Sequence, residues 1–257
     1  MKQYIVDAFT DTLFRGNQAA VCVMERWIPE DLMCSIAREN NFSETAFTVK
    51  EEDGYRLRWF TPGGEVDFCG HATLGTSFVL FSFYEKEAEE IVYHTQVGRL
   101  TVKRDGDLFI MDFPAYQCHP VPVTSAMREA MGVEPIEAYI DRDLLLVLAD
   151  EEQVRNLQPD QEKMKTLEGM LVAVTARGRD YDCVSRIFVP KLGIPEDPVT
   201  GSTHCMITPY WCDKLGKNRL TCFQASERSG ILYTALENDR VKVAGQAVLY
   251  AVAEILP

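Results

Sequence analysis

The stretch RWFTPGGEVDFCGHATLGTSFVLFSFY, residues 58–84, predicts a strand that leads into a buried helix. Residues 55–60 have the pattern of a strand that follows a turn at residues 52–54. The run from His71 to Tyr84 is apolar nearly all round, which is typical of a helix with no side facing solvent. Gly70 stands directly before this run. The stretch therefore predicts strands followed by a buried helix that starts at a glycine.

The same pattern returns in the second half of the chain. Residues 186–188 (RIF) follow residues 58–60 (RWF) by 128 positions, and Gly201 follows Gly70 by 131. The run from Ser202 to Leu215 then takes the place of the first buried helix. Two segments that begin with glycine and lead into hairpins, at residues 98 and 230, repeat at an offset of 132. Chance recurrence is the weaker explanation for three features in one order, so the chain reads as two similar halves.

This repeat predicts an α+β fold built from two pseudo-symmetric halves. Each half combines many short strands with one buried helix, and such layers pack around their own cores. Residues 114–122 contain three prolines and read as the connection between the halves. We expect an N-terminal half at residues 1–115 and a C-terminal half at residues 116–246. Halves of this kind can face each other across a cleft, and clefts are preferred ligand sites.

The composition is that of an ordinary globular protein. The 257 residues are 46% hydrophobic and 25% charged, with a formal net charge of −13. Such an acidic chain repels phosphate backbones, so we expect no nucleic-acid partner, and an anionic substrate needs a local positive feature. The apolar runs are too short for a membrane span or a secretory signal. Eight cysteines without a C-x-x-C motif read as reduced thiols, so we expect a cytoplasmic protein without a membrane partner.

Glu44, in the stretch NFSETAF at residues 41–47, lies between an expected helix and an apolar strand. A carboxyl group at such a boundary can accept and donate protons, although a surface or capping glutamate is the commoner case. At the 128-residue offset its counterpart is Val172, so only one half carries a carboxylate here. A residue needed for folding alone would more naturally occur in both halves. His71 and Asp197 are candidates to contact a substrate or to orient Glu44.

Gly70 and Gly201 each stand at the expected start of a buried helix. Free N–H groups at a helix start, together with the helix dipole, bind a carboxylate or phosphate well. Glycine lacks the side chain that would block a close approach. Ordinary helix capping explains the polar neighbours of these glycines equally well. The capping candidates are Asp67, Thr200 and Ser202.

Motifs for metals and cofactors are missing from the sequence. Cys69 and His71, combined with His204 and Cys205, could supply four ligands, but neither spacing resembles a zinc site. The chain has no G-x-G-x-x-G, P-loop or G-x-S-x-G motif. We therefore expect neither a metal nor a cofactor.

Four stretches together resemble the phenazine-biosynthesis PhzF-like family of isomerases, over essentially the whole chain. They are DAFT (7–10) with FxGNxAAV (14–21), NxSETAF (41–47), EVDxCGHAT (65–73) and EDPVTGS (196–202). The resemblance implies a diaminopimelate epimerase-like fold, in which each half is a mostly antiparallel barrel-like sheet around a central helix. It implies an active site in the cleft between the halves, and a homodimer. It also allows the C-terminal strand, residues 247–257, to complete the first half.

The resemblance further implies a chemistry. Glu44 matches the family's acid/base carboxylate, which would take a proton from an sp³ carbon and return it elsewhere on the same face. The small carboxylate trans-2,3-dihydro-3-hydroxyanthranilate would thus become a ketone tautomer without any cofactor. The residues that match substrate contacts are His71, Asp197 and Ser202, with main-chain groups near Gly70 and Gly201 holding the carboxylate.

One departure from the wider fold group bears on this mechanism. Epimerases of this fold use two opposed thiols, each placed just before a helix. Here Cys69 precedes Gly70, but Thr200 precedes Gly201, so the second thiol is missing. This favours isomerisation with Glu44 as the single base. Two alternatives stay open: an amino-acid epimerase or racemase in which Cys69 works with a non-thiol base, and a non-catalytic protein that binds a small carboxylate.

Overall fold

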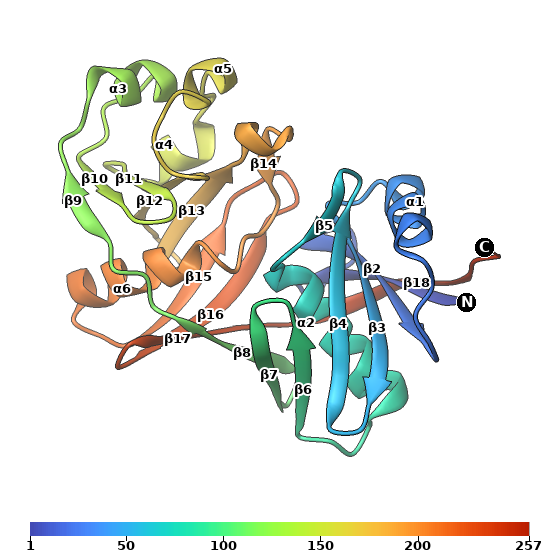
Figure 1. Ribbon diagram of the computed structural model, residues 1–257. Helices are drawn as coiled ribbons and strands as arrows, with labels where there is room; N and C mark the ends of the chain where they lie inside the picture. The colour runs from blue at the N-terminus through green and yellow to red at the C-terminus, as the bar shows by residue number, and fades with distance from the viewer. Residues whose placement is uncertain (257) are drawn as a thin grey trace. The chain divides into compact units, whose positions relative to one another are not determined.

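The computed structural model describes residues 1–256 and divides into two compact units. The first unit contains residues 1–112 together with the C-terminal residues from 244 onward, and the second contains residues 113–243. Figure 1 shows that each unit contains both strands and helices.

The first unit combines mixed parallel and antiparallel strands with two helices that pack against them. Its strands are β1 (Lys2–Ala8), β2 (Asn17–Met24), β3 (Glu44–Glu51), β4 (Gly54–Thr61), β5 (Gly64–Val66), β6 (Glu90–Thr95), β7 (Gly98–Asp105), β8 (Leu108–Pro114) and β18 (Ala247–Glu254). Its helices are α1 (Glu30–Asn40), α2 (Gly70–Val79) and the π-helical turn η1 (Leu80–Tyr84). Helix α2 packs on β1, β2 and β3. All of its residues except Phe78 are buried, which explains why its sequence is apolar nearly all round.

The second unit repeats this architecture. Its strands are β9 (His119–Val121), β10 (Glu137–Ile140), β11 (Leu144–Val147), β12 (Val172–Arg177), β13 (Cys183–Phe188), β14 (Glu196–Asp197), β15 (Arg219–Gln224), β16 (Gly230–Glu237) and β17 (Arg240–Gly245). Its helices are α3 (Ser125–Met131), α4 (Glu151–Asn156), α5 (Gln161–Met164), the 3₁₀ turn η2 (Pro190–Leu192) and α6 (His204–Leu215). Helix α6 packs on β15 and β16.

The strands of the two units pair in the same order. In the first unit β18 pairs with β1, and the pairs β1–β2, β3–β4, β4–β5 and β6–β7 are antiparallel, while β2–β3 and β4–β6 are parallel. In the second unit β9 pairs with β10, and the same sequence of antiparallel and parallel pairs runs from β10 to β16. This confirms the predicted α+β fold with two pseudo-symmetric, mostly antiparallel halves.

The structure corrects two details of the prediction. Helix α6 begins at His204 rather than Ser202, because residues 201–203 form a tighter turn in which the His204 N–H donates to the Gly201 carbonyl at 3.1 Å. The proline-rich segment 114–122, predicted as a plain connection, contains β9, which pairs with β10. Its prolines are compatible with a strand that pairs on one side only.

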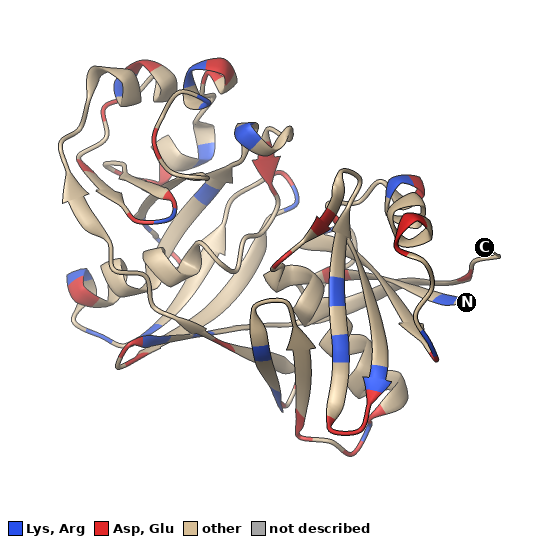
Figure 2. Ribbon diagram, in the orientation of Figure 1, with Lys and Arg blue, Asp and Glu red and all other residues tan. Residues whose placement is uncertain are grey.

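Charged residues are spread over both units. Figure 2 shows Asp and Glu in helices, turns and strand ends of each unit rather than along one element. Among residues 1–256, no helix is long and apolar enough to cross a membrane.

Candidate active site

In the first unit, three elements that begin at one edge of the sheet bring four polar side chains together. Strands β2 and β3 are parallel neighbours, so their first residues, Asn17 and Glu44, lie at the same edge. Helix α2 packs on both strands, and Cys69 and His71 lie at its start. The parallel pairing thus explains why residues 17, 44 and 69–71, far apart in sequence, form one cluster.

His71 is the centre of this cluster. Its Nε2 lies 3.1 Å from Glu44 Oε2, and its Nδ1 lies 3.1 Å from the Asn17 side-chain nitrogen. The Cys69 sulfur is 3.5 Å from His71 Nδ1. Nδ1 thus faces Asn17 and Cys69, and Nε2 faces Glu44.

Glu44 differs from the other carboxylates in its surroundings. Its side chain is 18% exposed, and its Oε2 atom is buried. Although His71 Nε2 is near, no donor among residues 1–256 is in hydrogen-bonding geometry with Oε2. A buried carboxylate oxygen without an aligned donor is able to accept a proton from a ligand.

Electrostatics favour holding protons within this cluster. Burial opposes charge on His71, but the adjacent Cys69 and Glu44 outweigh it, so the pKa of His71 lies well above the ordinary 6.5. Burial, helped by the Glu44 charge, raises the pKa of the Cys69 thiol to about 11. Cys69 is therefore a protonated thiol at neutral pH.

The second unit has no carboxylate at the position of Glu44. Strand β4 pairs Phe60 with Thr45, and the equivalent strand β13 pairs Phe188 with Val172. Through this register the counterpart of Glu44 is Leu171, one residue before the Val172 expected from the 128-residue offset. Either residue is apolar, so the difference between the units stands.

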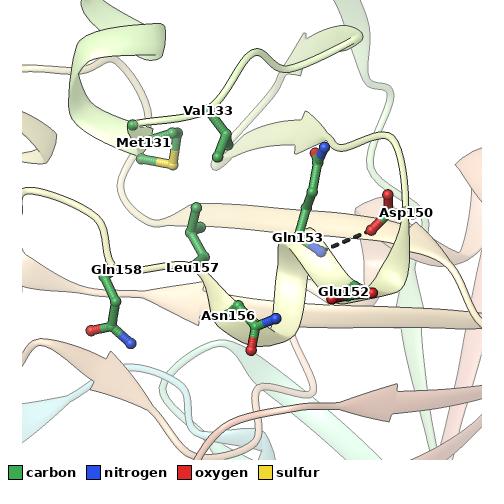
Figure 3. Close-up of a pocket in the computed structure, with 9 residues that line it drawn as sticks. Met131, Val133, Asp150, Glu152, Gln153, Asn156, Leu157 and Gln158 are labelled. Carbon is green, nitrogen blue, oxygen red and sulfur yellow. Dashed lines mark hydrogen bonds between the residues drawn. The ribbon is translucent and has the colours of Figure 1, made fainter.

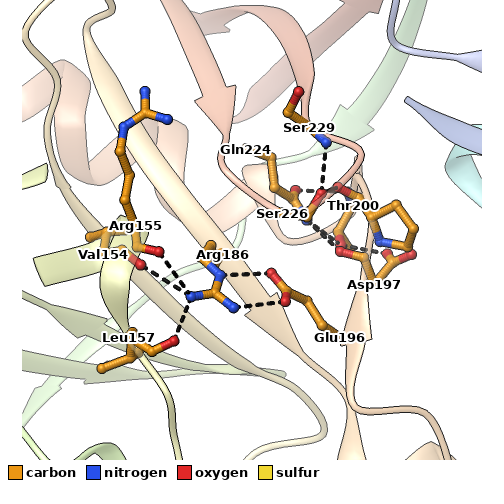
Figure 4. Close-up of polar contacts among 11 residues, drawn as sticks. Val154, Arg155, Leu157, Arg186, Glu196, Asp197, Thr200, Gln224, Ser226 and Ser229 are labelled. Atoms are coloured by element: carbon orange, nitrogen blue, oxygen red, sulfur yellow. Dashed lines mark hydrogen bonds and ion pairs between the residues drawn. The ribbon is translucent and has the colours of Figure 1, made fainter. Parts of the chain in front are cut away.

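Asp197 belongs to a separate polar group in the second unit. Its carboxylate accepts a hydrogen bond of 2.5 Å from the Thr200 hydroxyl. The Gln224 side chain on β15 donates to the Asp197 carbonyl at 2.8 Å and accepts from the Thr200 N–H at 2.9 Å. Figure 4 shows this group, in which Ser226 and Ser229 continue the network. Gln224 thereby fixes the loop that leads to Gly201.

Ser202 lies in the turn after Gly201, and its hydroxyl accepts a hydrogen bond of 3.3 Å from Arg142 Nη2. Gly201 is buried and Ser202 is partly exposed. Arg142 comes from the turn between β10 and β11, and it also contacts Tyr116 and Asp143.

An open groove elsewhere in the second unit contains none of the predicted site residues. It is formed by the end of α3 and by α4, as Figure 3 shows. Asp150 on its rim accepts a hydrogen bond of 2.9 Å from the Gln153 N–H, which is an ordinary helix cap. The Asp150 carboxylate in this groove therefore has a structural role, as the cap of α4.

Known proteins with similar sequence and structure agree on one family. The sequence pattern of the family described as phenazine biosynthesis-like protein matches residues 6–253. The chain belongs to this family. An uncharacterized isomerase of Pseudomonas aeruginosa is 45% identical, with 95% of each chain covered. The crystal structure of a PhzF-family phenazine biosynthesis protein of Enterococcus faecalis is 46% identical and superposes with a TM-score of 0.98 over 100% of this chain and 99% of that chain.

The fold extends beyond the PhzF-like family. A hydroxyproline epimerase of Agrobacterium vitis is only 9% identical, yet its structure matches with a TM-score of 0.62 over 98% of this chain and 91% of that chain. The PhzF-like chain thus shares its fold with epimerases. Three bacterial relatives that are 40–45% identical are named uncharacterized isomerases, and this chain is an isomerase of the same family.

The structure brings together some of the predicted site residues of this PhzF-like isomerase. Glu44, Gly70 and His71 lie in one group within the first unit, and Asp197, Gly201 and Ser202 lie along one loop and turn of the second. The contacts of Asn17 with His71 and of Arg142 with Ser202 were not predicted from the sequence. Asn17 falls within the FxGNxAAV stretch, which marked its neighbourhood but not its contact with His71.

Three atoms of the cluster are of the kinds that bind metals. Ligand atoms of Glu44, Cys69 and His71 lie within 4.8 Å of one another. A cation there would have to displace the proton of a thiol whose pKa is about 11 and that of a histidine with a raised pKa.

Proposed function

We propose that this PhzF-like isomerase moves a proton between two carbons of a small cyclic carboxylate, with Glu44 as the single acid/base. The observation that carries the proposal is the buried Glu44 Oε2 atom, which has no aligned donor and lies 3.1 Å from His71 Nε2. A base positioned in this way can take up a proton without first breaking a hydrogen bond.

The proposed reaction needs only proton movements. Glu44 removes a proton from the sp³ carbon that bears a hydroxyl group, and the C–H electron pair spreads over the conjugated ring as a carbanion. The same carboxyl group returns this proton to another ring carbon on the same face, which gives a neutral enol. The enol then becomes the ketone tautomer when its O–H proton is released to solvent and a ring carbon takes up a proton. Atoms and electrons balance within the substrate, so the proposal includes no cofactor. The family resemblance suggests trans-2,3-dihydro-3-hydroxyanthranilate as the first substrate to test.

His71 is the proposed partner of Glu44 during the reaction. Its Nε2 atom lies 3.1 Å from Glu44 Oε2, so the ring is close enough to keep the carboxylate in position. Gly70 and His71 in the first unit, and Asp197, Gly201 and Ser202 in the second, are proposed to bind the substrate.

The alternative of an epimerase that uses Cys69 has less support. A thiol with a pKa of about 11 is a poor base at neutral pH because almost none of it is ionised. Thr200, which precedes Gly201, offers no second thiol. A protein that only binds a carboxylate would not need an unpaired carboxylate oxygen in its interior.

The test is turnover of trans-2,3-dihydro-3-hydroxyanthranilate by the wild type and by Glu44→Gln. Loss of the base should lower kcat by about 10²- to 10⁴-fold. Glu51→Gln is the matched control, because Glu51 lies at the opposite end of the same strand and pairs with the exposed Arg56. Unchanged turnover by Glu44→Gln, with a native circular dichroism spectrum, would exclude Glu44 as the base.

A further inference from the structure

Arg142 is a partly buried cation beside the turn that starts α6. Its Nε donates to Asp143 Oδ1 at 3.2 Å, its Nη1 to the Tyr116 hydroxyl at 3.3 Å and its Nη2 to the Ser202 hydroxyl at 3.3 Å. The side chain is 33% exposed. A small ligand can therefore reach a guanidinium group that the fold already holds in place.

Arg142 differs from two other arginines that the fold holds in place. Arg58 grips both oxygens of Glu65 at 2.6 Å, and Arg186 grips both oxygens of Glu196 at 2.8 Å. Such forks are the preferred pairing of a guanidinium with a carboxylate. Arg142 has the same guanidinium group but makes no such pairing, because both of its Nη atoms contact neutral hydroxyl groups.

Asp143 does not complete this fork. Its side chain is fully buried, and its two oxygens also accept from the Leu171 N–H at 3.3 Å and from the Thr203 hydroxyl at 3.0 Å. Arg142 gives it only the Nε–H. A guanidinium has five N–H groups, so two remain for another acceptor.

The hydroxyl groups around Arg142 are also able to donate. Tyr116 and Ser202 each accept from Arg142, and within residues 1–256 neither hydroxyl donates to a protein acceptor. Each hydroxyl thus keeps a proton to offer. The two remaining guanidinium N–H groups and the two hydroxyl protons together form a set of donors complementary to an anion.

The internal repeat places this group at a functional position. Ser202 follows Gly201 as His71 follows Gly70, at the same offset of 131 residues. The offset agrees with the strand register, because Glu65 pairs with Phe60 as Glu196 pairs with Phe188. In the first unit Asn17, from the start of β2, contacts His71. In the second unit Arg142, two residues before β11, contacts Ser202.

We propose that Arg142 is a carboxylate-binding residue of this isomerase, which holds the substrate's carboxylate together with the Ser202 and Tyr116 hydroxyls. The inference rests on the proposed function in one respect, namely that the substrate is a small carboxylate. It gives this acidic chain, with its net charge of −13, the local positive feature that an anionic ligand requires.

The test compares two non-reacting probes, anthranilate and its neutral counterpart anthranilamide, by isothermal titration calorimetry. The wild type should bind anthranilate more tightly than anthranilamide. Arg142→Gln should weaken anthranilate binding by about 10- to 100-fold and leave anthranilamide unchanged, because only the carboxylate loses a charged partner. Arg142→Lys, which keeps the charge beside the buried Asp143, should show a smaller loss of the same kind. Arg128→Met, which removes an exposed arginine of the same unit, should bind both probes as the wild type does.

Three results would overturn the inference. The first is that the wild type binds anthranilate and anthranilamide with equal affinity. The second is that Arg142→Gln or Arg142→Lys prefers anthranilate over anthranilamide as strongly as the wild type does, and the third is that a folded variant loses affinity equally for both probes. The outcome is separable from that of the proposed function. Binding discrimination that depends on Arg142, without any turnover that depends on Glu44, would support this inference and contradict the proposed reaction. Turnover that depends on Glu44, combined with an unaltered preference for anthranilate in the Arg142 variants, would support the proposed reaction and contradict this inference.

Discussion

At the scale of single residues, His71 and His204 are both buried, but their surroundings move their pKa values in opposite directions. His71 has Glu44 and Cys69 as neighbours, which raise its pKa. His204 has a single hydrogen bond, in which Nδ1 donates to the Thr200 carbonyl at 2.8 Å, and its Nε2 is buried without a partner among residues 1–256. Burial therefore lowers the pKa of His204 from 6.5 to about 4.

This lowered pKa predicts a loss of stability in mild acid. Between pH 6.5 and about 4 the unfolded chain binds a proton at His204 that the folded chain does not, so the free energy of unfolding falls as the pH falls. The slope from this one group is about 1.4 kcal/mol per pH unit, and the total is about 3 kcal/mol. Urea unfolding from pH 7 to pH 4, compared between the wild type and His204→Gln, measures it. Parallel curves for the two proteins would contradict the prediction.

The contacts of the candidate site could be predicted from the sequence only in part. Glu44 and His71 were recognisable from their motifs, and the structure places them 3.1 Å apart. Asn17 and Arg142 were missed as contacts because tertiary packing brings each next to a partner that lies 54 or 60 positions away in the sequence. A local pattern does not carry information about such pairings.

At the scale of elements, a largely buried arginine–glutamate fork recurs at the same place in both units. Arg58 with Glu65 joins β4 to β5, and Arg186 with Glu196 joins β13 to β14. Arg186 also donates from Nη1 to the carbonyl of Leu157, at the end of α4, at 2.7 Å. Figure 4 shows Arg186 between the carboxylate and these carbonyls. The arginine thereby fixes the short strand from which Asp197 projects.

Arg186→Met should destabilise the protein by about 3–5 kcal/mol, because it leaves the Glu196 carboxylate and the α4 carbonyls without a donor. Urea unfolding measures the effect. Arg128→Met is the control, since the Arg128–Glu134 pair is exposed and should contribute about 1 kcal/mol or less. Equal effects of the two substitutions would show that the fork does not stabilise the second unit.

The repeat in the sequence predicted the elements but not their alignment to the residue. The 128-residue offset matched Glu44 with Val172, yet the strand register matches Glu44 with Leu171, because Thr45 faces Phe60 as Val172 faces Phe188. Likewise α6 starts after a tight turn that α2 lacks. Insertions between the copies shift such positions by one or two residues, and only the backbone pairing reveals the shift.

At the scale of the whole molecule, the first unit is completed by a strand from the far end of the chain. β18 pairs antiparallel with β1, from Lys2 with Glu254 to Ala8 with Ala247. Figure 1 shows the two chain ends close together in this unit. In the second unit the equivalent place beside β10 is taken by β9, which comes directly from the first unit in sequence. The offsets between motifs predicted the repeat, but the return of the C-terminal strand to the first unit was expected only from the family resemblance.

The exposed face of β18 supports the predicted homodimer. Tyr250 and Val252 are 51% and 52% exposed, and the ring of Phe14, itself 66% exposed, packs edge-on against Tyr250. We expect a second copy of the chain to cover this apolar group. Tyr250→Asp should then shift the mass measured by size-exclusion chromatography with light scattering from dimer to monomer. Ile136→Asp, which changes an exposed apolar residue of the second unit, should leave the dimer intact. A monomeric wild type would contradict the prediction.

The most direct test of the proposed chemistry is proton exchange in D₂O, followed by NMR. The wild type, Glu44→Gln and Glu51→Gln are each incubated with trans-2,3-dihydro-3-hydroxyanthranilate, and the ring-proton signals are recorded over time. The wild type and Glu51→Gln should convert the substrate or introduce solvent deuterium at a ring carbon, and Glu44→Gln should do neither. Equal conversion or exchange with and without the Glu44 carboxylate, or an unchanged spectrum with the wild type, would contradict the proposal that Glu44 moves a proton on this substrate.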